Sequence, residues 1–291
     1  MKMRYVLDNV HEDNILILEN LFKYENFIIK DFRKDKDISF LKEDDCIVWS
    51  IASIINNYNL FLNLRQKYIC YTLNALTPNV YQNIGFKKNC KGFISSSTEN
   101  QNMLNSLNLK SFFAPLIYNK LKDKINLNFK CKQISTLINN YKQFAGENTI
   151  HNINSYDYFQ LVKNNAPNVE LYDFSTDQKG SDIEILMNTK YYLHIKYWGH
   201  VCNAPLKALA LGVPVIMDDI TYRLGGYSYY LQSGFNCIIL QKPEEIINLI
   251  NNNIYETLYK NLKTNCINFK NKLTEDYSSA FYSNFKAFLN E

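Results

Sequence analysis

Residues 191–240 carry the strongest structural signal in the chain: YYLHIKYWGHVCNAPLKALALGVPVIMDDITYRLGGYSYYLQSGFNCIIL. Tyrosine and branched side chains at 191–195 predict a buried strand, and the alanine- and leucine-rich run at 204–211 predicts a compact helix. The apolar residues 213–217 predict a second strand. A strand, a helix and a strand in this order are typical of a parallel α/β sheet, so this segment sets the fold class.

The turn between that strand and that helix has the features of an anion site. Gly199 lies in its polar loop, Asn203 is expected to cap the helix, and Pro205 suits the first helical turn. Free N–H groups and the positive end of the helix dipole would then face a ligand, and a diphosphate would be favoured. Side chains that could add positive charge to the same anion are Lys196, His200, Lys207 and Arg223.

The same alternation runs through the whole chain and predicts two doubly wound α/β domains. Strands are expected at 3–7, 27–32, 45–50, 68–73, 92–96, 111–116, 134–138, 149–152, 169–172, 191–195, 213–217 and 237–240. Helices are expected at 14–23, 52–65, 99–107, 156–163, 182–187, 204–211, 244–251 and within 255–289. The polar segment 121–132 is expected to link domains at 1–120 and 133–275, with a C-terminal helix at 276–291 that packs back on the first domain.

Composition argues against other classes of protein. A net charge of +4 does not by itself indicate a nucleic-acid partner, and seven dispersed cysteines without a C-x-x-C spacing indicate neither a disulfide framework nor a zinc site. The most apolar stretch, 46–55, is too short to cross a bilayer, and charges at 11–13 interrupt any signal-peptide core. A cytoplasmic protein is expected, and a peripheral position at a membrane surface stays open.

Common nucleotide and hydrolase motifs are missing from the sequence. The turn after the first strand, residues 8–12, contains no glycine, which disfavours a nicotinamide dinucleotide fingerprint. The sequence also contains no P-loop, nucleophile elbow, H-E-x-x-H zinc motif or protein-kinase signature.

One resemblance to a known family stands out. The run PLKALALGVPVI at 205–216 resembles the LEALALGVPVI element of GT-B glycosyltransferases, in particular family four, also called group one. HIKYWGH at 194–200, SGFNCIIL at 233–240 and KPEEII at 242–247 resemble the segments that flank this element in some members. FISSST at 93–98, with Leu104 and Ala114-Pro115, resembles more weakly the strand, helix and strand that close their first domain.

The resemblance implies a GT-B fold, with two Rossmann-like domains facing across a cleft. It implies a metal-independent hexosyltransferase-like enzyme whose first domain binds a hydroxyl acceptor and whose second binds a UDP- or GDP-sugar, UDP being favoured. The donor is then a co-substrate and no cofactor is expected. The acceptor would be a glycan or glycolipid. Two alternatives stay open: transfer to a modified DNA base, and a non-catalytic GT-B-like binding protein.

The resemblance also assigns candidate residues. Relatives often carry two glutamates at the positions of Gly199 and Lys207, so ribose recognition is expected to differ here; Lys207 is either a phosphate ligand or a solvated helix residue. The implied donor or diphosphate ligands are Lys142, Lys196, Gly199, His200, Cys202, Asn203, Lys207, Arg223 and Gly225.

The first domain offers candidates for the acceptor side. His11, just beyond the first strand, is a candidate general base because imidazole titrates near neutrality, and Asp8 and Glu12 are carboxylate alternatives. Asn74 and Thr77 are candidate acceptor contacts. His194 lies inside a predicted strand, where a hydrogen-bonded core role is favoured.

Overall fold

The structure is a computed structural model that describes residues 4–8, 27–31, 37–43, 45–72, 78–116, 118, 121, 124, 133–136, 155–165, 171–173, 182–195, 201–242, 244–251, 254–276 and 279–290. The chain divides into two compact units. Unit 1 comprises Met1–Asn119 and Glu275–Glu291, and unit 2 comprises Lys120–Thr274. Within the described ranges, no helix combines the length and the apolar character that crossing a bilayer requires.

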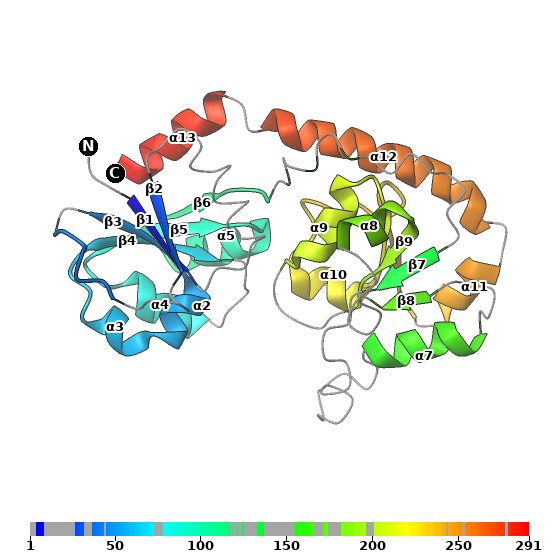
Figure 1. Cartoon of the computed structure of the whole chain (residues 1–291), viewed down its shortest axis with the longest axis horizontal. Coiled ribbons are helices and arrows are strands. Elements are labelled where there is room, and N and C mark those ends of the chain that lie inside the picture. The colour runs from blue at the N-terminus through cyan, green and yellow to red at the C-terminus, as the bar shows by residue number, and fades with distance from the viewer. Residues whose placement is uncertain are drawn as a thin grey trace. The chain divides into compact units, whose positions relative to one another are not determined.

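Unit 1 contains a six-stranded sheet of order β2-β1-β3-β4-β5-β6, in which every neighbouring pair is parallel (Figure 1). Its strands are β1 (Arg4–Asp8), β2 (Phe27–Asp31), β3 (Cys46–Ser50), β4 (Lys67–Thr72), β5 (Cys90–Ser95) and β6 (Ser111–Phe113). The central strands β3 and β4 are buried almost along their whole length, as expected for parallel strands covered on both faces.

The helices of unit 1 are α2 (Ile51–Asn56), α3 (Tyr58–Leu62), α4 (Pro78–Gly85), α5 (Thr98–Ser106) and α13 (Ser279–Asn290). Apolar side chains from α2, α3, α4 and α5 form one core cluster with the sheet. The C-terminal helix α13 packs on β6, because the ring of Phe112 lies 5.3 Å, 5.2 Å and 5.5 Å from the rings of Phe281, Phe285 and Phe288.

Unit 2 contains a five-stranded parallel sheet of order β11-β10-β9-β7-β8. Its strands are β7 (Gln133–Thr136), β8 (Leu171–Asp173), β9 (Thr189–Leu193), β10 (Val215–Asp218) and β11 (Cys237–Leu240). Its helices are α7 (Ser155–Asn165), α8 (Asp182–Met187), α9 (Asn203–Ala210), α10 (Asp219–Gly225) and α11 (Glu245–Asn251), followed by α12 (Ile254–Asp276).

The strand order of each sheet contains one reversal. In unit 1 the chain moves from β1 outward to β2 and then returns to β3, and in unit 2 it moves from β7 to β8 and returns to β9. Open α/β sheets bind ligands at the carboxyl ends of the strands beside such a reversal. The ends of β1 and β3, and of β7 and β9, are therefore the positions at which a ligand is expected in each unit.

Several elements differ from the sequence-based expectation. The helix expected at 52–65 is divided into α2 and α3, and the region 255–289 contains two helices, α12 and α13. Helices α4 and α10 were not expected. The helix expected at 14–23 and the strand expected at 149–152 lie outside the described residues.

Candidate functional site

The turn from β9 into α9 lies beside the reversal in unit 2, where Leu193 pairs with Thr136 of β7. His194 follows β9 and is fixed by its backbone, since its N–H donates to the carbonyl of Ile216 at 2.8 Å. Its ring is buried and stacks on that of Tyr192, with the ring centroids 5.9 Å apart. His194 therefore has the hydrogen-bonded core position that its place in the sequence favoured.

Tyr227 connects this strand end to the start of α9. The backbone N–H of Cys202 donates to the Tyr227 hydroxyl oxygen at 2.9 Å, and the same hydroxyl lies 3.2 Å from His194 Nε2. A hydroxyl that accepts from Cys202 can still donate its own proton to His194, which requires the imidazole proton to be on Nδ1. The three residues fix the strand end and the helix start relative to each other.

Burial keeps this tyrosine neutral. Burial raises the pKa of Tyr227 well above its ordinary value of 10.0; the Cys202 thiol raises it further, whereas the hydrogen bond from the Cys202 backbone N–H lowers it. The hydroxyl is therefore a stable hydrogen-bonding group across the whole neutral range. Sequence reasoning missed Tyr227, because its partners are far away along the chain and only the preceding glycine pair marked the region.

The start of α9 differs from the expectation. Asn203 was expected to be the N-cap, but it is the first helical residue and Cys202 is the N-cap, with no side-chain capping bond. The third residue after Cys202 is Pro205, which has no N–H for a cap to accept, so a proline is tolerated there and a capping bond is not formed. The Oδ1 atom of Asn203 is consequently buried without a hydrogen-bond partner in the part of the chain that the structure describes.

The remaining donors of the α9 N-terminus are backbone groups. The N–H groups of Asn203 and Ala204 belong to the first turn, where a helix offers no internal partner. Together with the helix dipole they form a small anion-binding surface. The N–H of Cys202 does not contribute to it, because this group already donates to the Tyr227 hydroxyl. Lys207 lies four residues after Asn203, on the same face of α9, and is half-buried.

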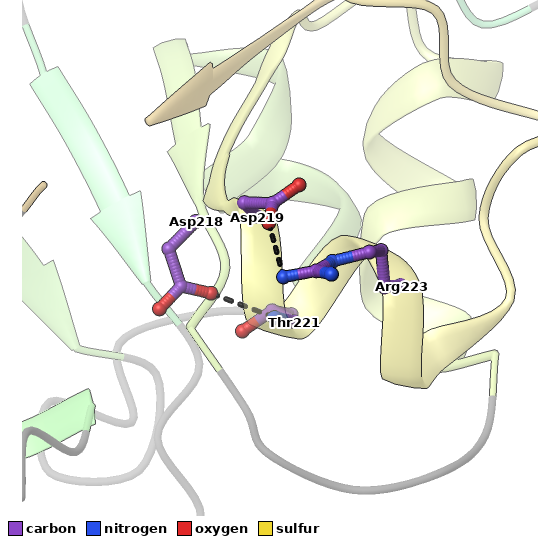
Figure 2. Close-up of polar contacts among 4 residues, drawn as sticks. All are labelled: Asp218, Asp219, Thr221 and Arg223. Carbon is purple, nitrogen blue, oxygen red and sulfur yellow. Dashed lines mark hydrogen bonds and ion pairs between the residues drawn. The ribbon is translucent and has the colours of Figure 1, made fainter. Parts of the chain in front are cut away.

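Arg223 and Gly225 lie in α10, which begins directly after β10. Asp218 caps α10 by accepting from the N–H of Thr221 at 2.8 Å, and Asp219 pairs with Arg223 at 2.5 Å (Figure 2). The Arg223 side chain is 69% exposed, so this ion pair holds it loosely. Gly225 has a packing role: a Cβ there would lie 2.2 Å from Cε2 of Tyr227.

The other donor-side candidates are not placed by the structure. Lys142, Lys196, Gly199 and His200 lie outside the described residues. Their assignment as donor ligands stays a prediction.

In unit 1, Asp8 is the last residue of β1 and lies at the carboxyl edge of the sheet beside the reversal. A catalytic group is expected at this position, because open α/β sheets bind ligands at the carboxyl ends of the strands beside a reversal. His11, Glu12, Asn74 and Thr77 lie outside the described residues.

A buried polar cluster occupies the ends of β4 and β5 at the same edge. Ser97 caps α5 by accepting from Asn100 N–H at 3.0 Å, Ser95 donates to the Ser97 carbonyl at 2.8 Å, and the Thr72 hydroxyl lies 3.1 Å from that of Tyr81. These hydrogen bonds are all internal, so the cluster supports the strand ends and is structural. In the described ranges no group of three or more His, Cys, Asp or Glu side chains could hold a metal ion.

The chain resembles known proteins in structure but not in sequence. No family model matches the chain, and no curated protein matches its sequence. By structure it is similar to Anabaena HepE in complex with UDP, with a TM-score of 0.61 and 11% identity over 100% of both chains. Sucrose-phosphate synthase from Thermosynechococcus elongatus matches at a TM-score of 0.62 and 11% identity, over 100% of this chain and 98% of that chain.

TarM matches at a TM-score of 0.59 and 11% identity, over 87% of this chain and 57% of TarM. All three are GT-B glycosyltransferases. At such low identity the similarity shows the fold, and this chain has the GT-B fold that the resemblance of residues 205–216 implied.

Proposed function

We propose that this protein is a glycosyltransferase that moves a sugar from a nucleoside diphosphate sugar, UDP-linked in preference, to a hydroxyl acceptor. The observation that carries the proposal is the uncapped N-terminus of α9 at the strand reversal of unit 2, with the buried Oδ1 of Asn203 unpaired beside it. The GT-B fold supports it, and so does the binding of UDP and UDP-glucose by Anabaena HepE.

On the donor side, the diphosphate binds at the first-turn N–H groups of Asn203 and Ala204. Lys207 neutralises charge that develops on the leaving diphosphate, with Lys142, Lys196 and His200 as further basic groups. Asn203 Oδ1 accepts a hydrogen bond from a hydroxyl of the donor, which satisfies an otherwise costly buried acceptor. In this scheme the positive groups take the place of a metal ion.

On the acceptor side, the hydroxyl oxygen attacks the anomeric carbon while the bond from that carbon to the diphosphate oxygen breaks. The leaving nucleoside diphosphate takes the bonding electron pair, and the hydroxyl proton passes to a base. Asp8 and His11 are the proposed bases, since β1 ends at the strand reversal of unit 1. The proposed acceptor is a glycan or glycolipid.

The donor site is tested by thermal stabilisation and product release. The protein is incubated with UDP, GDP and a panel of their sugar conjugates, and the melting temperature and nucleoside diphosphate release are followed. We expect UDP to stabilise the protein, because a ligand that binds only the folded state raises its free energy of unfolding. Absence of both stabilisation and release across the panel would contradict the proposal.

Variants locate the site within the chain. Asn203→Ala and Lys207→Ala are each expected to weaken UDP binding by about tenfold, a loss of about 1.4 kcal/mol. Tyr222→Phe is a matched control, because the Tyr222 hydroxyl donates to the Leu231 carbonyl at 3.1 Å and belongs to α10. Nucleotide binding without sugar release, with full binding retained in Lys207→Ala, would instead indicate a non-catalytic binding protein.

A further inference from the structure

The segment between Asp45 and Glu99 contains no acidic residue. It carries five basic residues, Arg65, Lys67, Lys87, Lys88 and Lys91. The chain as a whole is nearly balanced, with 32 basic and 28 acidic residues, so the imbalance is local. Within this segment, no acidic side chain offsets the basic ones; the acidic residues that flank it are Asp45, just before β3, and Glu99 in α5.

The same segment exposes large apolar side chains. Ile55 on α2 is 48% exposed, and Tyr58 and Leu62 on α3 are 47% and 48% exposed. Phe86, just after α4, is 65% exposed, more than any other large apolar side chain in the part of the chain that the structure describes. Side chains of this size at one site mark an interaction surface more often than isolated exposed residues do.

Contacts bring these residues together. The Nζ of Lys87 lies 4.6 Å from the centroid of the Phe61 ring, which places the end of α4 against α3. The side-chain amide of Asn89 donates to the carbonyls of Leu64 and Gln66, both at 2.9 Å, and fixes the loop after α4 to the loop after α3. Figure 1 draws α2, α3 and α4 on the same side of the six-stranded sheet.

We call this region the basic-apolar surface: Ile55, Tyr58, Leu62 and Phe86 with Arg65, Lys67, Lys87 and Lys88. It extends to the amino edge of the sheet, since the loops after α3 and α4 lead into the starts of β4 and β5. The acceptor-side candidate Asp8 lies at the opposite, carboxyl edge. The basic-apolar surface is therefore separate from the crevice of unit 1.

We propose that the basic-apolar surface docks the protein on an anionic lipid bilayer. Exposed aliphatic and aromatic side chains enter the boundary between headgroups and acyl chains, and surrounding lysine and arginine side chains attract anionic headgroups. The two contributions together give reversible attachment where either one alone is weak.

Charge and apolar character together favour a bilayer over other partners. A nucleic acid would use the basic residues but would gain nothing from the exposed Ile55 and Leu62, because its backbone and base edges are polar. A protein interface tends to exclude lysine from its centre, whereas lysine side chains are concentrated here. The occupant that uses both features is an anionic lipid surface.

The test is cosedimentation of the full chain with vesicles of phosphatidylcholine alone and with vesicles that also contain about 30% phosphatidylglycerol. Binding to the anionic vesicles is expected, and it should fall as salt is added because counterions screen the charges. Arg65→Gln with Lys88→Gln is expected to weaken binding by roughly 30-fold, and Phe86→Ser by roughly tenfold.

Matched controls come from unit 2. Lys242→Gln with Lys260→Gln removes two exposed lysines, and Leu224→Ser removes an apolar side chain that is 42% exposed. Neither should change vesicle binding. All variants should keep UDP-induced stabilisation, which separates this proposal from the donor site: either can fail while the other holds.

Three results would overturn the proposal. The first is equal binding to neutral and anionic vesicles, or binding to neither. The second is a dimer in solution that Phe86→Ser abolishes, which would assign the surface to a second copy of the chain. The third is binding to short duplex DNA that depends on Arg65 and Lys88 while vesicles do not bind.

Discussion

The turn from β5 into α5 and the turn from β9 into α9 share a plan but end differently. Each leads from the carboxyl end of a parallel strand into a helix. At α5 the cap is internal, since Ser97 accepts from the N–H of Asn100 at 3.0 Å. At α9 the N-cap Cys202 forms no such bond, and Pro205 stands where a capping donor would be.

A second turn in unit 2 shows that the difference is local to α9. Asp218 caps α10 by accepting from Thr221 N–H at 2.8 Å, in the same way as Ser97 in unit 1. First-turn N–H groups need partners, and a turn whose own side chains supply none leaves them for a ligand. Of these three turns, only the α9 turn has an N-cap residue whose side chain forms no capping bond, and it also lies beside the strand reversal.

Giving α9 an acidic cap of its own is the strongest way to remove this difference. Cys202→Asp places a carboxylate at the N–H groups of Asn203 and Ala204, where it occupies the donors and repels a diphosphate. UDP binding is expected to fall by about 100-fold, about 2.7 kcal/mol, while the free energy of unfolding of the free protein is unchanged or rises by up to about 1 kcal/mol. Calorimetric titration and urea unfolding measure the two.

Cys202→Ala is the matched neutral variant. It adds neither a charge nor an oxygen that could cap α9, so UDP binding should change by less than about threefold. A Cys202→Asp protein that still binds UDP at full strength would show that the diphosphate does not lie at α9.

A substitution that crowds the Tyr227 ring should also disturb the α9 turn, because Tyr227 binds the N-cap residue Cys202. Gly225→Ala puts a Cβ within 2.2 Å of Cε2 of the buried Tyr227 ring, which must move away from Cys202 and His194. Overpacking of this kind is expected to lower the free energy of unfolding by about 2 kcal/mol and to weaken UDP binding as well. Urea unfolding and thermal shift with UDP measure both effects.

Gly234→Ala separates crowding from backbone strain. Gly234 has a φ of +76° and no atom within 4 Å of an added Cβ, so the substitution strains the backbone without touching Tyr227. It should cost about 1 kcal/mol and leave UDP binding intact. Equal losses of UDP binding in the two variants would remove the link between Tyr227 and the donor site.

The sequence predicted the layout of both sheets because their strands are buried and leave a strong local pattern. β11 coincides with the expected 237–240, β3 begins one residue later than expected, and β4 is shifted by one residue at both ends. Strand order could not be predicted, since it depends on contacts between segments far apart along the chain. Short helices were missed: α10 has only seven residues and ends in a glycine pair, which by itself is typical of a loop.

The site was predictable in position but not in its hydrogen bonds. Local propensity favours asparagine at an N-cap, and this indicated Asn203, one residue too late. The helix start is fixed by a contact between Cys202 and Tyr227, which are separated by 25 residues and by α9, β10 and α10. No pattern in the sequence shows such a contact.

The two turns should also differ in their response to pH, because a tyrosine supports α9 and a serine supports α5. Burial raises the pKa of Tyr227 well above 10.0, and burial raises the pKa of Cys237, also in unit 2, from 9.0 to about 12. In the unfolded chain both groups lose protons at their ordinary pKa values. The contribution of Cys237 to stability is therefore complete below pH 9 and is lost as pH rises toward 12, whereas that of Tyr227 is complete below pH 10 and falls above it.

The expected slope is about 1.4 kcal/mol of unfolding free energy per pH unit for each group. Urea unfolding at several pH values above 9 measures the slope, and Cys237→Ala should reduce it by one group's share. A slope unchanged in Cys237→Ala would mean that this thiol titrates in the folded state at its ordinary pKa.

The smallest effect is expected from opening the α5 turn. Ser97→Ala leaves the N–H of Asn100 without its acceptor in a buried position, so the free energy of unfolding should fall by about 1 kcal/mol. Ser97→Asp keeps an acceptor and should recover most of that loss, whereas Ser106→Ala, at an exposed site near the end of α5, should cost less than about 0.5 kcal/mol. UDP binding should be the same in all three variants. Removing the cap of α5 frees an N–H group, but α5 lies away from the strand reversal, so no ligand is expected to bind there. A loss of UDP binding in Ser97→Ala would place the nucleotide at unit 1 and would reverse the roles assigned to the two turns.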